Sequence, residues 1–132
     1  MLLALGLLLV GILGIVAVFV GGLKLSARAN QLAGATQVGR ELLERVRQRQ
    51  RDLGFSTLPT GTYQYNGWAN DPTTGAPPNA YPPSPYPRAN LNQVDYTVVV
   101  YGQQPSAFLK TVKVEVYWNQ DHFVTLETRY HP

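Results

Sequence analysis

The side chains that could take part in catalysis are few and scattered in this 132-residue chain. His122 falls in an expected turn and His131 is the last residue but one, so neither is placed as a general acid or base. The serines lack a G-x-S-x-G setting, and no phosphate-binding loop, dinucleotide fingerprint or zinc-ligand spacing is present. The sequence therefore predicts a protein that is not an enzyme and has no catalytic residues, metal ligands or cofactors.

A cluster of arginines is the strongest local charge feature of the chain. Its members are Arg40, Arg45, Arg47, Arg49 and Arg51. Arginines can meet phosphates, but no aromatic residue is interleaved here to stack on bases. The pairs Arg40 with Glu44 and Glu41 with Arg45 have the i,i+4 spacing of helical ion pairs. We expect a solvated, self-paired helix face, with DNA as an alternative partner that the sequence does not favour.

The longest apolar stretch of the chain is its beginning. Residues Met1–Leu23 include no charged side chain and no Asn, Gln, His, Ser or Thr. At 1.5 Å per residue, such a helix is roughly 34 Å long, enough to cross the hydrocarbon core of a bilayer at about 30 Å. A helix that is apolar on all sides is typical of a membrane span or of the centre of an assembly. Its glycines would weaken it in water, whereas lipid enforces helical hydrogen bonds and close helix packing uses small residues.

Two other interpretations of this stretch stay open. It could be a signal peptide cut at Ala27-Arg28-Ala29, although it exceeds the usual apolar region of about 7 to 15 residues, lacks a basic start and continues its helical period through the site. It could also be a simple membrane anchor. All basic residues follow the span, so the positive-inside rule would leave the folded part in the cytoplasm, unless a basic segment precedes Met1.

Residues 24–53 continue the helix in amphipathic form. The apolar positions follow steps of three and four and comprise Leu25, Ala29, Leu32, Ala35, Gly39, Leu42, Leu43, Val46 and Leu53. We expect this stripe to pack on a sheet. Leu53-Gly54 predicts the end of the helix, with glycine at the C-terminal cap.

Residues 54–93 hold eight of the ten prolines and predict a loop region rather than helix. Within it, Thr62–Tyr65 predicts one short strand, and Ala80–Pro87 predicts an extended or polyproline-like surface loop. A proline-rich ligand for an adaptor domain is the alternative. Asn70–Thr73 offers oxygen ligands for calcium, but it also spells an Asx turn and lacks EF-hand spacing, so a turn is expected. The candidate surface-binding residues of this loop are Tyr81, Tyr86 and Arg88.

Residues 94–132 alternate apolar and polar side chains with the period of a strand. Three apolar sets result: Val94, Tyr96, Val98 and Val100; Val112, Val114, Val116 and Trp118; Val124, Leu126, Thr128 and Tyr130. The connections expected between them are residues 102–107 and the tight turn Asn119–His122. Because a small sheet needs a covering element, the sequence predicts an α+β fold in which the long N-terminal helix packs on a C-terminal antiparallel β-meander of three to four strands.

This order of elements resembles the type IV pilin superfamily. Leu2–Gly14 is similar to the N-terminal helix of minor pilins, in which V-G-I-L-G type cores recur. Leu42–Arg47 resembles the L-x-E-R-M-R motif at the C-terminal end of their helix. Val112–Trp118 and Val124–Thr128 together resemble their final hairpin. The resemblance covers both ends of the chain but not the proline-rich middle.

One departure from the family pattern concerns the start of the chain. Family members begin, after prepilin peptidase cuts a short basic leader, with an N-methylated residue, a T-L-x stretch and a glutamate. Met1 would fall directly after that glutamate, so the sequence as given lacks the leader, the cleavage site and the acidic residue. We expect the true beginning to lie upstream of Met1, and a basic leader there would also resolve the topology.

The resemblance implies a structural subunit, a minor pilin that assembles through its N-terminal helix. It implies an inner-membrane single-pass precursor with a periplasmic domain, which then joins an extracellular pilus, and partners that are other pilin subunits, the inner membrane and platform proteins of the pilus or secretion system. The expected role is to initiate or cap the fibre, with adhesion, motility or DNA uptake downstream. The alternatives are a minor pseudopilin of a type II secretion system and a single-pass membrane protein presenting a Pro-rich binding loop. The residues expected to make membrane and assembly contacts are Leu2, Leu5, Leu8, Gly11, Gly14, Val18 and Phe19.

Overall fold

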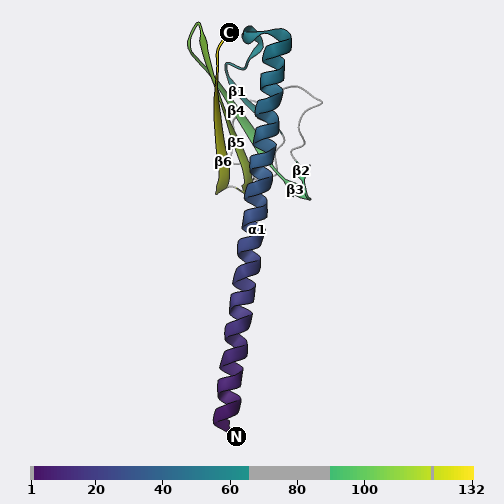
Figure 1. The fold of residues 1–132 in the computed structure, drawn as a ribbon. Helices are drawn as coiled ribbons and strands as arrows, with labels where there is room; N and C mark the ends of the chain where they lie inside the picture. Colours follow the sequence, from purple (N-terminus) through teal and green to yellow (C-terminus); the bar gives the residue numbers. More distant parts are fainter. Residues whose placement is uncertain (1, 66–89, 120) are drawn as a thin grey trace. The chain divides into compact units, whose positions relative to one another are not determined.

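The computed structural model describes residues 2–65, 90–119 and 121–132 (Figure 1). The chain forms two compact units, Met1–Gln31 and Leu32–Pro132, and helix α1 (Leu2–Leu53) contributes to both. The boundary falls inside the amphipathic segment 24–53 that the sequence predicts. The expectations for the proline-rich loop and for Asn70–Thr73 lie outside the described residues.

The first unit consists of the apolar part of α1. Its large apolar side chains are exposed along the whole segment, from Leu3 at 86% to Leu25 at 72%. By length and composition, α1 is a helix that could cross a membrane. The apolar segment is therefore helical over a length that could span a membrane, as the sequence predicts.

The end of α1 has the cap that the sequence predicts. Gly54 follows the last helical residue with φ of 92°, a backbone conformation that favours glycine, and its N–H donates to the carbonyl oxygen of Gln50 at 2.9 Å. A short 3₁₀ helix, η1 (Phe55–Thr57), comes next. The chain thus turns sharply enough to bring the following strand back along the helix.

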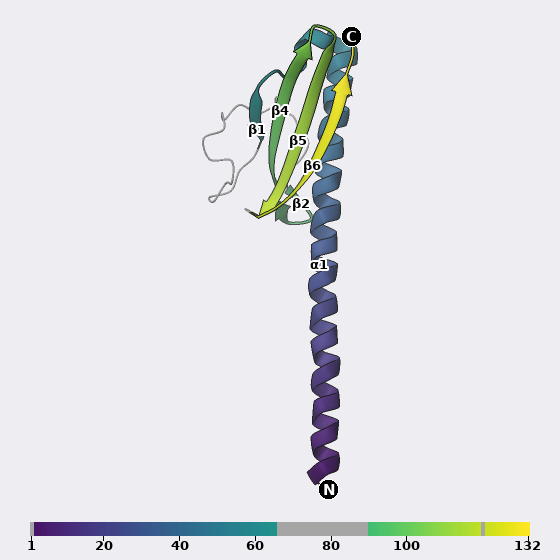
Figure 2. The same cartoon turned by 90° about the vertical axis from the view of Figure 1, so that its left-hand side faces the viewer.

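The second unit contains a four-stranded antiparallel sheet (Figure 2). Its strands are β1 (Thr62–Tyr65), β4 (Thr97–Ser106), β5 (Leu109–Asn119) and β6 (His122–Tyr130), in the order β1-β4-β5-β6. Strands β2 (Asn90–Leu91) and β3 (Val94–Asp95) form a separate hairpin. Asn92 and Gln93 between them both have positive φ, which is the geometry of a two-residue hairpin turn.

The core lies between the sheet and the part of α1 in the second unit. The buried side chains at its centre are Ala35, Val38, Leu42 and Val46 of α1 and Val98, Val100, Val112, Val114 and Val116 of β4 and β5. Gly34 and Gly39 let the helix approach closely, because a Cβ would collide with Tyr96 at the first position and with Leu126 at the second. The fold is the predicted α+β, pilin-like arrangement of a long N-terminal helix packed on a C-terminal antiparallel sheet.

The limits of the predicted stripe were wrong. Leu25, Leu32 and Leu53 are 72%, 48% and 60% exposed, and Ala29 is exposed as well. Within the second unit, the buried positions of α1 run from Gly34 to Val46, and Leu32 and Leu53 lie outside this stretch. Val38, which the pattern left out, is 1% exposed. Periodicity identifies one face of a helix, but the length of the covering strands decides how much of that face is buried.

Three local predictions also differ from the structure. Val94 belongs to the β2–β3 hairpin and not to the strand that carries Val98, since the chain leaves the strand conformation at Tyr96. β4 continues to Ser106, so most of the expected connection 102–107 is strand. On the helix, Glu44 pairs with Arg51 at 3.6 Å rather than with Arg40, and Glu41 accepts a hydrogen bond from Gln37.

Lys110 fastens the segment after α1 to the sheet. Its side chain is buried, and its Nζ donates to the carbonyl oxygens of Phe55, Ser56 and Leu58 at 3.0, 3.2 and 3.3 Å. The same ammonium lies 5.0 Å from the centre of the Phe55 ring. Three carbonyl groups of an irregular segment therefore share one charged donor from β5.

Candidate functional site

The predicted assembly residues all lie on α1. Leu5, Leu8, Val18 and Phe19 are 63–77% exposed, and Leu2 is the first residue of the helix. Burying a large apolar side chain stabilises it by about 1.5–3 kcal/mol. Leaving the many such side chains of this segment in water is therefore unfavourable by tens of kcal/mol, on the order of the sum of these contributions. By length and composition, this helix could cross a membrane.

The glycines of the same segment leave room for a neighbouring helix. A Cβ built on Gly6, Gly11 or Gly14 has nothing within 4 Å. Gly11 and Gly14 are three residues apart and therefore neighbours on the helix surface. Small residues on a helix surface allow the backbones of packed membrane helices to approach each other.

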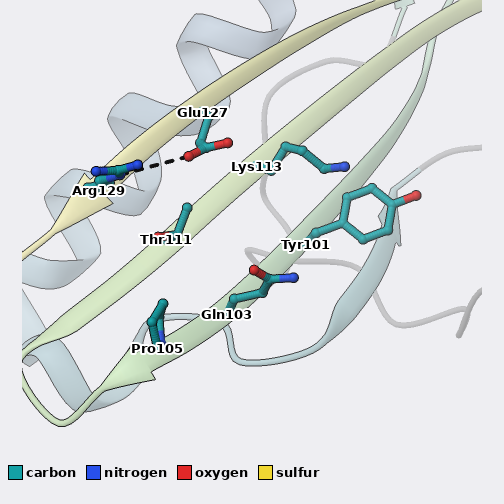
Figure 3. Close-up of a pocket in the computed structure, with 7 residues that line it drawn as sticks. All are labelled: Tyr101, Gln103, Pro105, Thr111, Lys113, Glu127 and Arg129. Carbon is teal, nitrogen blue, oxygen red and sulfur yellow. Dashed lines mark ion pairs between the residues drawn. The ribbon is translucent and has the colours of Figure 1, made fainter.

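The outer face of the sheet, away from α1, carries a shallow hollow of about 450 Å³ (Figure 3). Three strands supply its lining: Tyr101, Gln103 and Pro105 of β4, Thr111 and Lys113 of β5, and Glu127 and Arg129 of β6. The strand register places Lys113 between Tyr101 and Glu127. None of these side chains belongs to a predicted site. In an alternating strand pattern the polar residues are expected simply to face solvent, so nothing in the sequence distinguishes them.

The charges beside this hollow largely satisfy one another. Lys113 Nζ lies 2.9 Å from Glu115 Oε1 and 4.4 Å from the centre of the Tyr101 ring, and the Tyr117 hydroxyl donates to Glu115 Oε2 at 2.7 Å. The bond to Glu115 raises the pKa of Lys113. Burial works against ionisation of Glu115, but hydrogen bonds from Lys113 and Tyr117 outweigh it and lower its pKa. These contacts join neighbouring side chains of β5 to one another and, through Tyr101, to β4.

A second hollow, of about 590 Å³, lies between α1 and the end of β6; we call it the arginine groove. Its lining residues are Arg40, Leu43, Glu44, Arg47, Gln50, Thr128, Arg129, Tyr130 and His131. Tyr130 donates its hydroxyl to the carbonyl oxygen of Leu43 at 3.2 Å, which closes the floor of the groove. The arginine cluster is visible in the sequence. Only the fold shows that Arg40 and Arg47 line the groove together with Arg129, whereas Arg45 does not.

The other predicted functional residues are distributed as follows. Tyr81, Tyr86 and Arg88 lie outside the described residues. His122 starts β6 with its ring 6.1 Å from that of Trp118, and His131 borders the arginine groove. Among residues 2–65, 90–119 and 121–132, no group of three His, Cys, Asp or Glu side chains could hold a metal ion.

Comparisons of the chain with protein-family models, curated proteins and solved structures find no match.

Proposed function

We propose that this protein is a minor pilin, a structural subunit of a type IV pilus that assembles through the apolar part of α1 and helps to initiate or cap the fibre. The observation that carries the proposal is a single helix with two different environments. From Leu3 to Leu25 it exposes its large apolar side chains, whereas from Ala35 to Val46 one face is buried under a sheet. Adhesion, motility or DNA uptake would be its downstream roles.

The physical basis is exchange of one apolar environment for another. Before assembly, lipid of the inner membrane surrounds residues 2–23, and the sheet unit lies in the periplasm. In the fibre, the same side chains pack against the helices of other subunits, so little apolar surface passes through water. Glycines at positions 11 and 14 support this step, because nothing fills the space beside them.

Single aspartate substitutions test the proposal. Leu8→Asp and Gly14→Asp place a carboxylate in the middle of the apolar helix, at a cost of about 2.5–3.5 kcal/mol for insertion. We expect both variants to be lost from the membrane fraction and from sheared fibres, as measured by immunoblot of each fraction. Leu8→Ile and Gly14→Ala are matched controls that keep the segment apolar and should stay in the membrane.

The alternatives give distinct results in the same experiment. Normal amounts of both aspartate variants in fibres would refute the proposal. Wild-type protein that stays in the membrane and never enters fibres would indicate a simple anchor, and a secretion defect on deletion would indicate a type II pseudopilin. A mature soluble species that starts at Asn30 would identify the apolar segment as a cleaved signal peptide.

A further inference from the structure

The arginine groove holds more positive charge than its own carboxylates neutralise. Glu44 is the acidic residue in its lining, and its ion pair is with Arg51, 3.6 Å away. Arg129 lies 4.0 Å from Glu127, the limit of an ion pair, and both side chains are largely exposed. Arg40 and Arg47 form no ion pair with any residue that the structure describes. The groove is thus suited to an anionic partner.

The carboxylates of the second unit are mostly committed elsewhere. Glu115 and Glu127 are in ion pairs, Glu41 accepts a bond from Gln37, and Asp95 accepts one from Asn90. Asp52 lies in the last turn of α1, at the same end of the unit as the arginines. Asp121 remains.

Asp121 is exposed just before β6, and it is in none of the ion pairs found among the described residues. It cannot reach the arginine groove of its own chain. Asp121 stands at the start of β6, whereas the groove borders the other end of that strand, at Thr128–His131. At about 3.3 Å per residue, an extended strand places these ends about 25–30 Å apart. Figure 2 shows the two ends of β6 well apart, with the C-terminus beyond the second of them. A contact between Asp121 and the groove therefore requires two molecules.

We propose that Asp121 of one copy docks in the arginine groove of the next, with its carboxylate accepting hydrogen bonds from the guanidinium groups of Arg40 and Arg47. This inference rests on the proposed function, since it describes how the sheet units of successive subunits meet. The partner is a second copy of this chain, chosen because the two surfaces are complementary in charge and lie at opposite ends of one strand.

The contact is heterologous, because different surfaces of the two copies meet. Heterologous contacts generate rings or open chains rather than closed dimers, which is the geometry that a filament needs. Charge pairs at an exposed groove weaken as salt is added, since the Debye length falls from about 30 Å at 0.01 M to about 10 Å at 0.1 M. The association should therefore be stronger at low ionic strength.

Disulfide trapping tests the geometry directly, because the chain has no cysteine of its own. The full chain is purified in detergent, which covers the apolar helix so that association reports on the sheet unit. The pair His131→Cys and Asn119→Cys places one thiol at the border of the groove and one near Asp121, and it keeps Asp121, Arg40 and Arg47. We expect oxidation at low salt to produce a ladder of dimers, trimers and higher species on a non-reducing gel. The control pair is Arg45→Cys with Asn119→Cys, because Arg45 is exposed outside the groove.

Charge exchange tests the chemistry. In the trapping background, Asp121→Arg should lower the cross-linked fraction about tenfold, corresponding to about 1.4 kcal/mol. Adding Arg47→Glu should restore much of it, whereas adding Arg45→Glu should not. Equal ladders from the groove and control pairs, or no rescue by Arg47→Glu, would overturn the inference. If the ladder is absent while wild-type protein still enters fibres, the inference fails and the proposed function stands; absence from both refutes both.

Discussion

Replacement of Lys110 by methionine tests how the segment after α1 is held to the sheet. Methionine keeps the length and apolar contacts of the side chain and removes the ammonium group. The carbonyl oxygens of Phe55, Ser56 and Leu58 then lose their shared donor. The residue that carries the third of these carbonyls, Leu58, is only 3% exposed, so water cannot readily replace the lost bond there.

The magnitude follows from opposing contributions. A hydrogen bond to a charged group is worth about 1.5–3 kcal/mol, and a buried carbonyl left without a partner costs about 1–3 kcal/mol. Removing the ammonium also relieves its desolvation penalty, which is several kcal/mol for a buried ion and offsets part of the loss. The net expectation is that Lys110→Met lowers the free energy of unfolding by about 2–4 kcal/mol, a large share of the roughly 5–15 kcal/mol of a typical domain.

The assay is urea unfolding of the full chain in detergent, followed by far-ultraviolet circular dichroism and by tryptophan fluorescence, to which the half-buried Trp118 contributes. Hydrogen exchange of the amides at 55–58 should accelerate in the variant before the sheet unfolds. Arg45→Met removes an exposed cation and should stay within about 0.5 kcal/mol of the wild type. A Lys110→Met effect equally small would refute the view that this lysine anchors the segment.

Two further predictions concern the sheet. Gly102→Ala should strongly destabilise the second unit in the same assay, because a Cβ there would overlap the backbone of Pro59 and Thr60, whereas Gly61→Ala should be tolerated, since only the Tyr63 side chain lies nearby, at 3.8 Å. The lowered pKa of Glu115 means that its stabilising effect is present above its ordinary value of 4.5 and is lost as pH falls through the lowered pKa, so Glu115→Gln should flatten the acid arm of a stability profile, and an unchanged arm would contradict this.

The glycines of α1 have two distinct physical roles. In the second unit, Gly34 and Gly39 face side chains of the sheet unit and allow close packing within one molecule. In the first unit, a Cβ built on Gly11 or Gly14 meets nothing within 4 Å. Under the proposed function, a single helix uses the same residue type for folding in one part and for assembly in another.

The α+β class, the long helix, its end at Leu53 and the strand Thr62–Tyr65 could be predicted from the sequence. These features depend on local properties: the uninterrupted apolar run, the spacing of apolar residues by three and four, the cap glycine, and alternation with period two. The turn Asn119–His122 was predicted for the same reason, since its residues favour a tight connection.

Only the tertiary structure decided which of these residues work together. The burial of Val38 and the exposure of Leu32 depend on where the sheet covers the helix. Likewise, Lys110 alternates in phase with the buried Val112 and Val114, but only the turn at Gly54 brings three carbonyls to its ammonium group. The arginine groove joins Arg40 to Arg129, far along the chain, because strand pairing brings the end of β6 beside α1. Local patterns carry information about the next few residues, whereas these contacts depend on long-range packing that no short pattern encodes.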